Sequence, residues 1–414
     1  MIPGLLGWVT RREGQKFLKL RQTPDARFGG ASLEGKKLSL YVHIPFCRTL
    51  CPFCCFNRYP YKEDRARAYF KFLKKELDRY LEKGAVFSDV YFGGGTPTIL
   101  MDELSDFVDY ARKRFTVGQT SLETTPFEIN PQNLEKLREQ CGVNRLSIGV
   151  QAFDDAILRS MGRVSLPADE IKIKVVMAQG RFDTLNIDFV FNYPGQSFEQ
   201  FRADVAMFKS LGIDQATFYP LMPSPHKKEA MERKFNQVDN TREKAFYDII
   251  LSEVYSQGYT ASTAWCFSRG NRLIDEYIVD SDDYIGIGSG SVSLVEDTFY
   301  VNTFSLDRYA GLLGEGRLPV IGWRKLSRRE YLRYYLLTKL FALKIDKKAF
   351  FTRFGREIDR ALPAELLFLK GSGLVRDGGT IEVTRRGMYP VSVIMREFFS
   401  ALNTLREQCI RNQL

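Results

Sequence analysis

The chain has 414 residues, of which 44% are hydrophobic and 27% are charged, proportions that are ordinary for a globular protein. No apolar run approaches the roughly 20 residues that a membrane-spanning helix requires, which argues against an integral membrane protein. The net charge of +10 favours an anionic partner, although a solvated basic surface is the simpler explanation. The sequence has no basic cluster interleaved with aromatic residues, so nucleic acid is not the expected partner.

The first segment of the chain, residues 1–37, is predicted to be a lead-in to the first strand. This basic segment could cover an active site, contact a membrane surface or do neither, and the sequence leaves these alternatives open. A βα rhythm then begins with the apolar run Leu38–Ile44, which has the length of a strand. The segment Asp64–Lys83 follows with apolar residues on one face, and this periodicity predicts a helix.

Further apolar runs alternate with helical patterns as far as about Tyr259. Strands that are apolar on both faces and alternate with helices indicate a parallel sheet covered by helices. We therefore predict an α/β fold in which residues 38–264 form a (β/α)6-type partial TIM barrel. The chemistry of such a barrel is expected at the carboxyl ends of its strands.

The pattern changes in the last third of the chain. Residues 265–326 are predicted to be a connecting segment with a glycine turn, and residues 327–414 a mostly helical C-terminal domain. Ser327 and Glu330 have the spacing of a capping box that opens a helix. A pair of short strands is expected within residues 374–383.

Three cysteines that follow the first predicted strand give the strongest chemical signal. Cys47, Cys51 and Cys54 have C-x3-C-x2-C spacing, and three thiolates on one loop can hold three corners of a 4Fe–4S cube. The fourth iron is then open to a small molecule. Structural zinc is the alternative, but it usually takes four ligands in two separated pairs, and the sequence has only two histidines and no second C-x-x-C. A low-potential cluster predicts a reducing, cytoplasmic location.

Other groups that could bind a cofactor fall at the ends of later strands. Three glycines precede Thr96 and allow close approach of a ligand to the backbone. Glu123, Gln151 and Asp188 end successive strands, and Arg163 could pair with a carboxylate. Each of them alone is typical of a surface or capping residue, and it is the shared location that indicates a site. Cys55 is predicted to be a structural or spare thiol.

Several motifs accompany the cysteine loop in a fixed order. They are YVHIPFC (Tyr41–Cys47), GGGTPT (Gly93–Thr98), GVNRLSIGVQAF (Gly142–Phe153), MGR (Met161–Arg163) and NIDFVF (Asn186–Phe191). Together they resemble the radical S-adenosylmethionine (SAM) superfamily, and within it the oxygen-independent coproporphyrinogen III oxidase family and its relatives. The resemblance extends from about Tyr41 to the glycine turn near Gly288.

The resemblance implies a 4Fe–4S cluster on Cys47, Cys51 and Cys54, and one or two molecules of SAM. The SAM on the cluster would contact Tyr41, Gly94 and Glu123. A second SAM would contact Phe53, Gly95, Thr96, Gln151, Arg163 and Asp188. The expected partners are a small-molecule substrate and a reducing electron donor of the flavodoxin or ferredoxin type.

Two departures from the family pattern bear on the reaction. Phe56 stands where the coproporphyrinogen oxidases have a fourth cysteine, and residues 270–283 lack the HNxxYW motif of the related heme chaperones. The leading hypothesis is a radical SAM enzyme that acts on an unsaturated, anionic small molecule, porphyrin-like or other, as a class C type methyltransferase. The alternatives are a coproporphyrinogen III oxidase-like enzyme of porphyrin biosynthesis, a heme-binding chaperone and, ranked last, an enzyme acting on transfer RNA.

Overall fold

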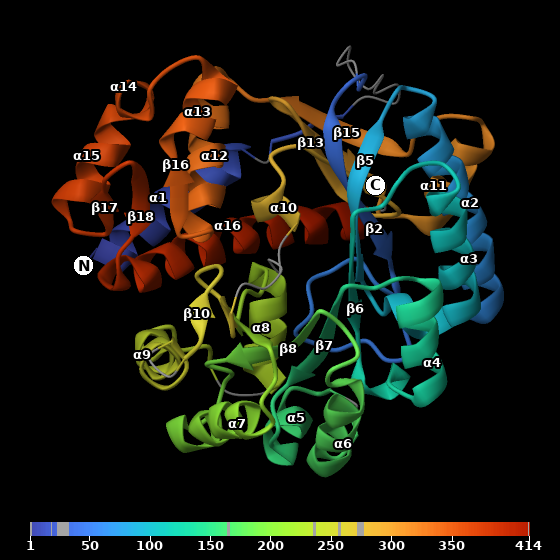
Figure 1. The fold of residues 1–414 in the computed structure, drawn as a ribbon, viewed down its shortest axis with the longest axis horizontal. Coiled ribbons are helices and arrows are strands. Elements are labelled where there is room, and N and C mark those ends of the chain that lie inside the picture. The colour runs from blue at the N-terminus through green and yellow to red at the C-terminus, as the bar shows by residue number, and fades with distance from the viewer. Residues whose placement is uncertain are drawn as a thin grey trace.

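One large twisted sheet organises the chain in the computed structural model (Figure 1). The structure describes residues 2–17, 19–22, 33–163, 166–234, 237–255, 258–270, 277–412 and 414. Residues 23–32 of the predicted lead-in segment therefore lie outside the described part. Within that part, no helix is both long enough and apolar enough to cross a membrane.

The centre of the sheet is the predicted barrel. Its parallel strands, in sheet order, are β2 (Lys37–Ile44), β5 (Val86–Gly94), β6 (Gln119–Thr124), β7 (Arg145–Gln151), β8 (Thr184–Phe191) and β9 (Gln215–Pro220). The helices that follow them are α2 (Glu63–Leu81), α3 (Met101–Arg112), α4 (Pro131–Glu135), α5 (Asp155–Ser160), α6 (Ala168–Ala178), α7 (Phe198–Ser210), α8 (Pro225–Lys234) and α9 (Glu243–Glu253). The α/β partial barrel is thus confirmed.

Sequence pattern explains these elements. In β2, every residue after Lys37 is buried, as expected for a parallel strand covered on both faces. In α2, the predicted apolar face is buried, and Gly84 ends the helical segment with a φ of 82°, a conformation that glycine adopts without a steric penalty.

Further strands, most of them from the predicted connecting segment, extend the barrel sheet at both edges. Beside β2 lie β12 (Tyr284–Ile287), β13 (Val292–Val295), β14 (Thr298–Asn302), β15 (Val320–Lys325) and β1 (Arg21–Gln22). Beside β9 lie β11 (Cys266–Ser268) and β10 (Thr260–Ala261). The helices α10 (Tyr277–Asp280) and α11 (Leu306–Gly314) belong to the same stretch. The pairing of β12 with β2 is parallel, whereas the outer strands are antiparallel.

The C-terminal region is mostly helical and includes a small sheet. Its helices are α12 (Arg328–Phe341), α13 (Lys347–Phe354), α14 (Ile358–Ala361), α15 (Pro363–Gly371) and α16 (Arg385–Arg411). The predicted strand pair is β17 (Val375–Asp377) and β18 (Thr380–Val383), and the sequence pattern missed a third strand, β16 (Lys344–Asp346). The predicted capping box of Ser327 and Glu330 opens α12.

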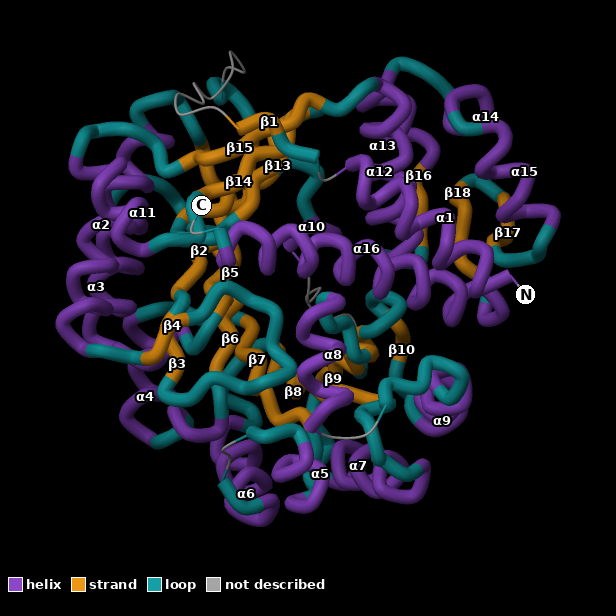
Figure 2. Tube along the Cα trace, turned by 180° about the vertical axis from the view of Figure 1, so that it is seen from behind, coloured by secondary structure: helices purple, strands orange, loops and turns teal. Residues whose placement is uncertain are grey.

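The long helix α16 runs across the molecule from the C-terminal region to the barrel (Figure 1). In the opposite view it passes above the carboxyl ends of the parallel strands (Figure 2). Helix α1 (Ile2–Phe17), which the sequence pattern did not indicate, packs along it. A side chain at Gly14 would lie 3.2 Å from Ala401, and Arg11 pairs with Glu397 at 2.9 Å. Small residues therefore allow α1 and α16 to approach closely.

Candidate functional site: a cavity between the barrel strands and helix α16

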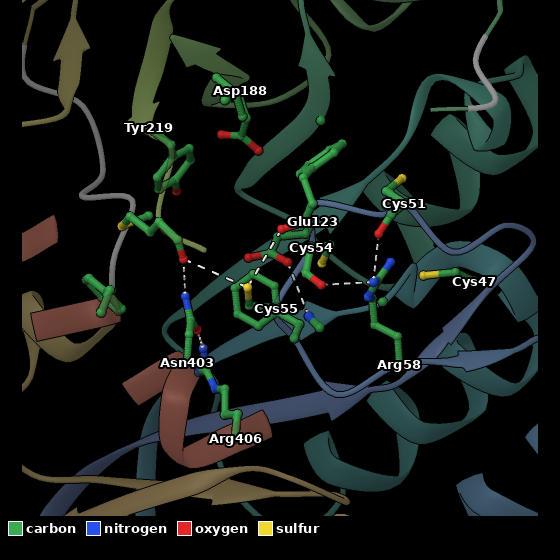
Figure 3. Close-up of a pocket in the computed structure, with 18 of the residues that line it drawn as sticks. Cys47, Cys51, Cys54, Cys55, Arg58, Glu123, Asp188, Tyr219, Asn403 and Arg406 are labelled. Carbon is green, nitrogen blue, oxygen red and sulfur yellow. Dashed lines mark hydrogen bonds between the residues drawn. The ribbon is translucent and has the colours of Figure 1, made fainter. Parts of the chain in front are cut away.

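A cavity of about 330 Å³ opens at the carboxyl ends of the parallel strands (Figure 3). All the residues proposed from sequence line it: Tyr41, Cys47, Cys51, Phe53, Cys54, Gly94, Gly95, Thr96, Glu123, Gln151, Arg163 and Asp188. They come from strands and loops spread over some 150 residues of chain. The structure brings these residues together at the carboxyl ends of the strands, where the sequence analysis expected the chemistry.

The cysteine loop lies between two short parallel strands, β3 (Phe46–Cys47) and β4 (Tyr59–Pro60). One guanidinium nitrogen of Arg58, Nη2, donates to the carbonyls of Cys51 at 2.9 Å and Cys54 at 3.0 Å. The Tyr61 N–H donates to the Cys47 carbonyl at 2.9 Å. The loop backbone is therefore held at three points, while its thiols line the cavity. The sequence analysis did not single out Arg58, although it lies only four residues after Cys54.

The thiols of the loop form no disulfide in this structure, and Cys47 Sγ accepts a hydrogen bond from the Thr96 hydroxyl at 3.8 Å. All seven cysteines are free, and burial raises the pKa of Cys47 to about 11. Within the described ranges, no group of three or more His, Cys, Asp or Glu side chains is already arranged as a metal site. Cys47, Cys51 and Cys54 share one cavity wall, so they form a soft-donor set on one loop rather than a preformed cage.

The glycine turn after β5 packs directly against the start of the cysteine loop. A Cβ on Gly95 would lie 2.6 Å from the Phe46 carbonyl oxygen, and one on Gly94 would lie 2.7 Å from the His43 ring. The N–H groups of Gly95 and Thr96 donate to the carbonyls of Ile44 and Phe46, each at 2.8 Å. These glycines are thus required by close packing of backbone on backbone.

Glu123 lies behind this turn with both carboxylate oxygens engaged. Tyr91 donates its hydroxyl to Oε1 at 2.9 Å, and the Gly94 N–H donates to Oε2 at 3.2 Å. Burial raises the pKa of Glu123, although these two donors oppose the rise. The carboxylate is therefore oriented into the cavity wall by its own neighbours.

A second set of polar side chains lies at the ends of β7 and β8. Asp188 accepts hydrogen bonds from Ser147 at 2.9 Å and Asn186 at 2.7 Å, and burial raises its pKa to about 7. Arg163 donates to the Gly149 carbonyl at 2.5 Å. Gln151 has a φ of 75° at an irregular end of β7, a strained conformation for a residue with a side chain. Strain of this kind is often found at ligand-binding positions.

Below the glycine turn, the buried His43 ring is hydrogen-bonded on both sides. His43 Nε2 donates to the Asn57 carbonyl, and its Nδ1 accepts from the Tyr41 hydroxyl, both at 2.9 Å. Burial lowers the pKa of His43 to about 4, so the ring is neutral at pH 7. Tyr41 is thereby fixed with its ring at the cavity wall.

The glycine turn near Gly288 is a packing turn. Of the described residues in this turn, Gly286–Gly290, none lines the cavity. The Gly288 N–H donates to the buried Glu76 carboxylate at 2.8 Å, and Asn302 and Tyr309 donate to the same carboxylate at 2.7 and 2.5 Å. The structure therefore shows a tight turn that packs against Glu76 and does not reach the cavity.

Sequence reasoning missed the wall that lies opposite the barrel. Cys55 Sγ lies 3.8 Å from the Met222 carbonyl, which also accepts from Asn403 Nδ2 at 2.8 Å (Figure 3). Arg406, one turn further along α16, lines the same wall. No sequence motif links Asn403 or Arg406 to Cys55, because about 350 residues separate them along the chain. Only the path of α16 brings them near.

Comparison with known proteins agrees with this geometry. Residues 41–208 match the model of the radical SAM superfamily. The chain is 25% identical to the heme chaperone HemW of Bacillus subtilis (strain 168), over 84% of this chain and 96% of that protein. It is 28% identical to the oxygen-independent coproporphyrinogen III oxidase of Salmonella typhimurium, over 85% of this chain and 82% of that protein.

The fold comparison covers still more of the chain. The structure of coproporphyrinogen III oxidase (HemN) from Escherichia coli aligns with a TM-score of 0.77 over 92% of this chain and 95% of that chain, at 23% identity. This likeness shows that the partial barrel and its C-terminal region form the same fold. Residues 41–208 thus match the radical SAM superfamily, and most of the chain is similar to the oxygen-independent coproporphyrinogen III oxidases and to HemW.

Proposed function

We propose that Cys47, Cys51 and Cys54 hold a 4Fe–4S cluster whose fourth iron binds SAM, and that the enzyme acts on an unsaturated, anionic small molecule. The observation that carries this proposal is the shared cavity: three thiols from one short loop and the polar groups of five strand ends line the same space. The superfamily match implies the cluster and SAM as cofactors.

The residues present fit such a cluster. Three soft thiol donors lie on one loop, and Arg58 holds the backbone of that loop through two carbonyls. The positive charge of Arg58 also lies close enough to lower the pKa of Cys47, against the stronger effect of burial. Thiolates would be stabilised further by iron, which deprotonates its thiol ligands. Cys47, Cys51 and Cys54 would hold the cluster, which would supply the one electron needed to break the carbon–sulfur bond between the 5′-deoxyadenosyl group and the methionine of SAM.

The chain's own residues would position SAM. Glu123 and the carbonyls of the glycine turn would accept hydrogen bonds from its ammonium or ribose, because the turn's N–H groups already donate within the protein. Tyr41 would pack beside it. A flavodoxin- or ferredoxin-type donor would supply the electron.

A second SAM would lie on the neighbouring part of the wall. The residues for it are Phe53, Gly95, Thr96, Gln151, Arg163 and Asp188, all of which line the cavity. The half-buried Arg163 and the carboxyl group of Asp188 match the carboxylate and ammonium of one amino acid moiety. We propose that this molecule is the methyl or methylene source of a class C type reaction, because Phe56 replaces the fourth cysteine of the coproporphyrinogen oxidases. An oxidoreductase reaction with SAM cleavage alone is the alternative outcome.

A heme chaperone is a second candidate, favoured by the similarity to HemW. The histidines argue against it. His43 is buried and hydrogen-bonded through both ring nitrogens, and His226 is exposed on α8. Neither histidine lines the cavity, so neither is placed to bind heme iron there. A chaperone would bind heme stoichiometrically without sustained cleavage of SAM.

Anaerobic reconstitution with iron and sulfide, followed by dithionite and SAM, tests the two candidates together. The proposed enzyme forms 5′-deoxyadenosine, detected by liquid chromatography, and heme causes no spectral shift on titration. A reconstituted protein that binds heme tightly and forms no 5′-deoxyadenosine contradicts the proposed function. The class C type reaction additionally requires S-adenosylhomocysteine among the products, because that is what remains of SAM when its methyl carbon is transferred.

A further inference from the structure

The wall of the cavity formed by α16 carries a cation that faces the site. Arg406 donates through Nη1 to Asn403 Oδ1 at 2.9 Å, and its guanidinium carbon lies 4.9 Å from the centre of the Phe56 ring. These contacts hold the guanidinium in place without neutralising it. Among the described residues, no carboxylate forms an ion pair with Arg406.

The other arginines of the cavity have different tasks. Arg48 forms a two-point ion pair with Glu128, at 2.7 and 3.3 Å. Arg58 binds the carbonyls of the cysteine loop, and Arg163 binds the Gly149 carbonyl on the side proposed for SAM. Arg406 is therefore the arginine on the α16 wall that is placed to bind an anionic group of a substrate. Burial chiefly lowers the pKa of His43, and the charge of Arg406 adds to that effect, so the field of Arg406 extends to the buried ring of His43 behind the cavity wall.

Helix α16 holds Arg406 at a fixed distance from the cysteine loop. Asn403 Nδ2 donates to the Met222 carbonyl, and Cys55 Sγ contacts that same carbonyl. Asn403 thus links α16 to the loop next to the proposed cluster ligand Cys54. A recognition group on a packed helix is positioned more rigidly than one on a surface loop.

An apolar chamber adjoins Arg406 within the same cavity. Six of its lining residues are Tyr219, Trp265, Tyr284, Tyr334, Phe398 and Leu402. The rings of Tyr219 and Trp265 lie 5.8 Å apart, and those of Tyr334 and Phe398 lie 6.1 Å apart. Such a chamber accepts a flat, apolar body, and a bound carboxylate at its margin would fix the orientation of that body.

We propose that Arg406, supported by Asn403, is the specificity-determining residue that binds a carboxylate of the substrate, while the aromatic chamber holds the substrate's flat apolar body. The planar guanidinium fork matches a carboxylate through two hydrogen bonds, which a lysine ammonium does not reproduce. This inference rests on the proposed function, since it names the substrate class of the same cavity. The substrate's unsaturated carbon would then lie between Arg406 and the cysteine loop.

Calorimetric titration of the anaerobically reconstituted protein with 2-naphthoate and its neutral isostere 2-naphthamide tests the assignment. The native protein is expected to bind the carboxylate about tenfold more tightly than the amide. Arg406→Gln should bring the two affinities together by weakening only the carboxylate, and Arg406→Lys should restore part of the preference. Arg411→Gln is the matched control, because Arg411 lies on the same helix, pairs with Glu407 and does not line the cavity.

Two results overturn the assignment. One is a native protein that binds the two probes equally or binds neither, and the other is an R406Q variant that keeps the full preference for 2-naphthoate. Formation of 5′-deoxyadenosine without substrate is measured on the same samples. Loss of carboxylate preference with normal SAM cleavage in R406Q supports the inference. Absence of SAM cleavage in the native protein contradicts the proposed function and leaves the probe preference as a separate result.

Discussion

The two walls of the cavity are built in different ways. The barrel wall comes from a cysteine loop, a glycine turn and the ends of successive parallel strands, each fixed by backbone packing with its neighbour in the sheet. The opposite wall comes from α16, β12, α12 and Trp265 just before β11, which are brought together by the packing of the C-terminal region on the barrel. The barrel wall is suited to holding cofactors in a fixed geometry, and the α16 wall to selecting a substrate.

The largest expected effect lies in the cysteine loop. Cys51→Ser removes a proposed iron ligand and should abolish SAM cleavage and most bound iron, because a hydroxyl is a poor substitute for a thiolate. Cys55→Ser is the matched control: Cys55 contacts the Phe53 and Met222 carbonyls and should not be a ligand. Iron content and 5′-deoxyadenosine formation measure both variants. If C55S loses iron as completely as C51S does, the assignment of ligands is wrong.

The glycine turn should respond to a single methyl group. In Gly95→Ala the new Cβ would meet the backbone of Pro45 and Phe46 within 2.6 to 2.9 Å, where backbone cannot move aside cheaply. We expect a loss of about 3 kcal/mol in unfolding free energy and reduced iron content. Gly311→Ala is the control, because nothing lies within 4 Å of a Cβ at Gly311 in α11. A G95A protein as stable as the native one would show that the turn is not close-packed.

The junction between the barrel and its extension should depend on pH. Burial raises the pKa of Glu76 to about 7, above its ordinary value of 4.5. The folded state therefore binds the extra proton, and its stability is full below pH 4.5 and falls as pH rises through 7. We expect Glu76 to contribute a loss of about 2 kcal/mol between pH 5 and 8. Denaturant unfolding of the native protein and Glu76→Gln at both pH values measures it. Equal pH dependence in the two proteins would contradict the assignment.

The smallest expected effect concerns the support of the cysteine loop. Arg58→Gln removes two hydrogen bonds to loop carbonyls, each with a net value of about 1 kcal/mol. The loop should remain folded but lose iron faster to a chelator. Arg112→Gln removes a comparable pair of bonds, to the carbonyls of Gln140 and Cys141, away from the cavity. The rate of iron loss should therefore rise in R58Q and stay unchanged in R112Q; equal rates would show that Arg58 does not support the loop.

The same difference between the walls explains what could be predicted from sequence. Strand periodicity gave the order of β2 to β9, and the motifs at their ends gave every proposed cofactor residue. The chemistry of Cys47, Cys51 and Cys54 depends on spacing within one loop, so it can be predicted from a short stretch of sequence. Helix α1 and strand β12 were missed because their partners, α16 and β2, lie far away in the chain. Strands β13 to β15 were missed although they pair with neighbours along the chain.

The α16 wall was also missed for a physical reason. Asn403 and Arg406 lie in an amphipathic helix whose pattern indicates only that one face is buried. Nothing in that pattern says that this face meets Phe56 and Met222, more than 180 residues earlier. The bond between Asn403 and the Met222 carbonyl exists only in the folded chain. Arg58 is a different case, since its closeness to Cys54 could have drawn attention to it.

The most direct test of the central claim is low-temperature electron paramagnetic resonance of the reconstituted, dithionite-reduced protein before and after addition of SAM. The account predicts about four iron ions per chain and a reduced-cluster signal whose g values shift when SAM binds the open iron. A protein that retains zinc, or a cluster whose signal is unchanged by saturating SAM, would contradict it.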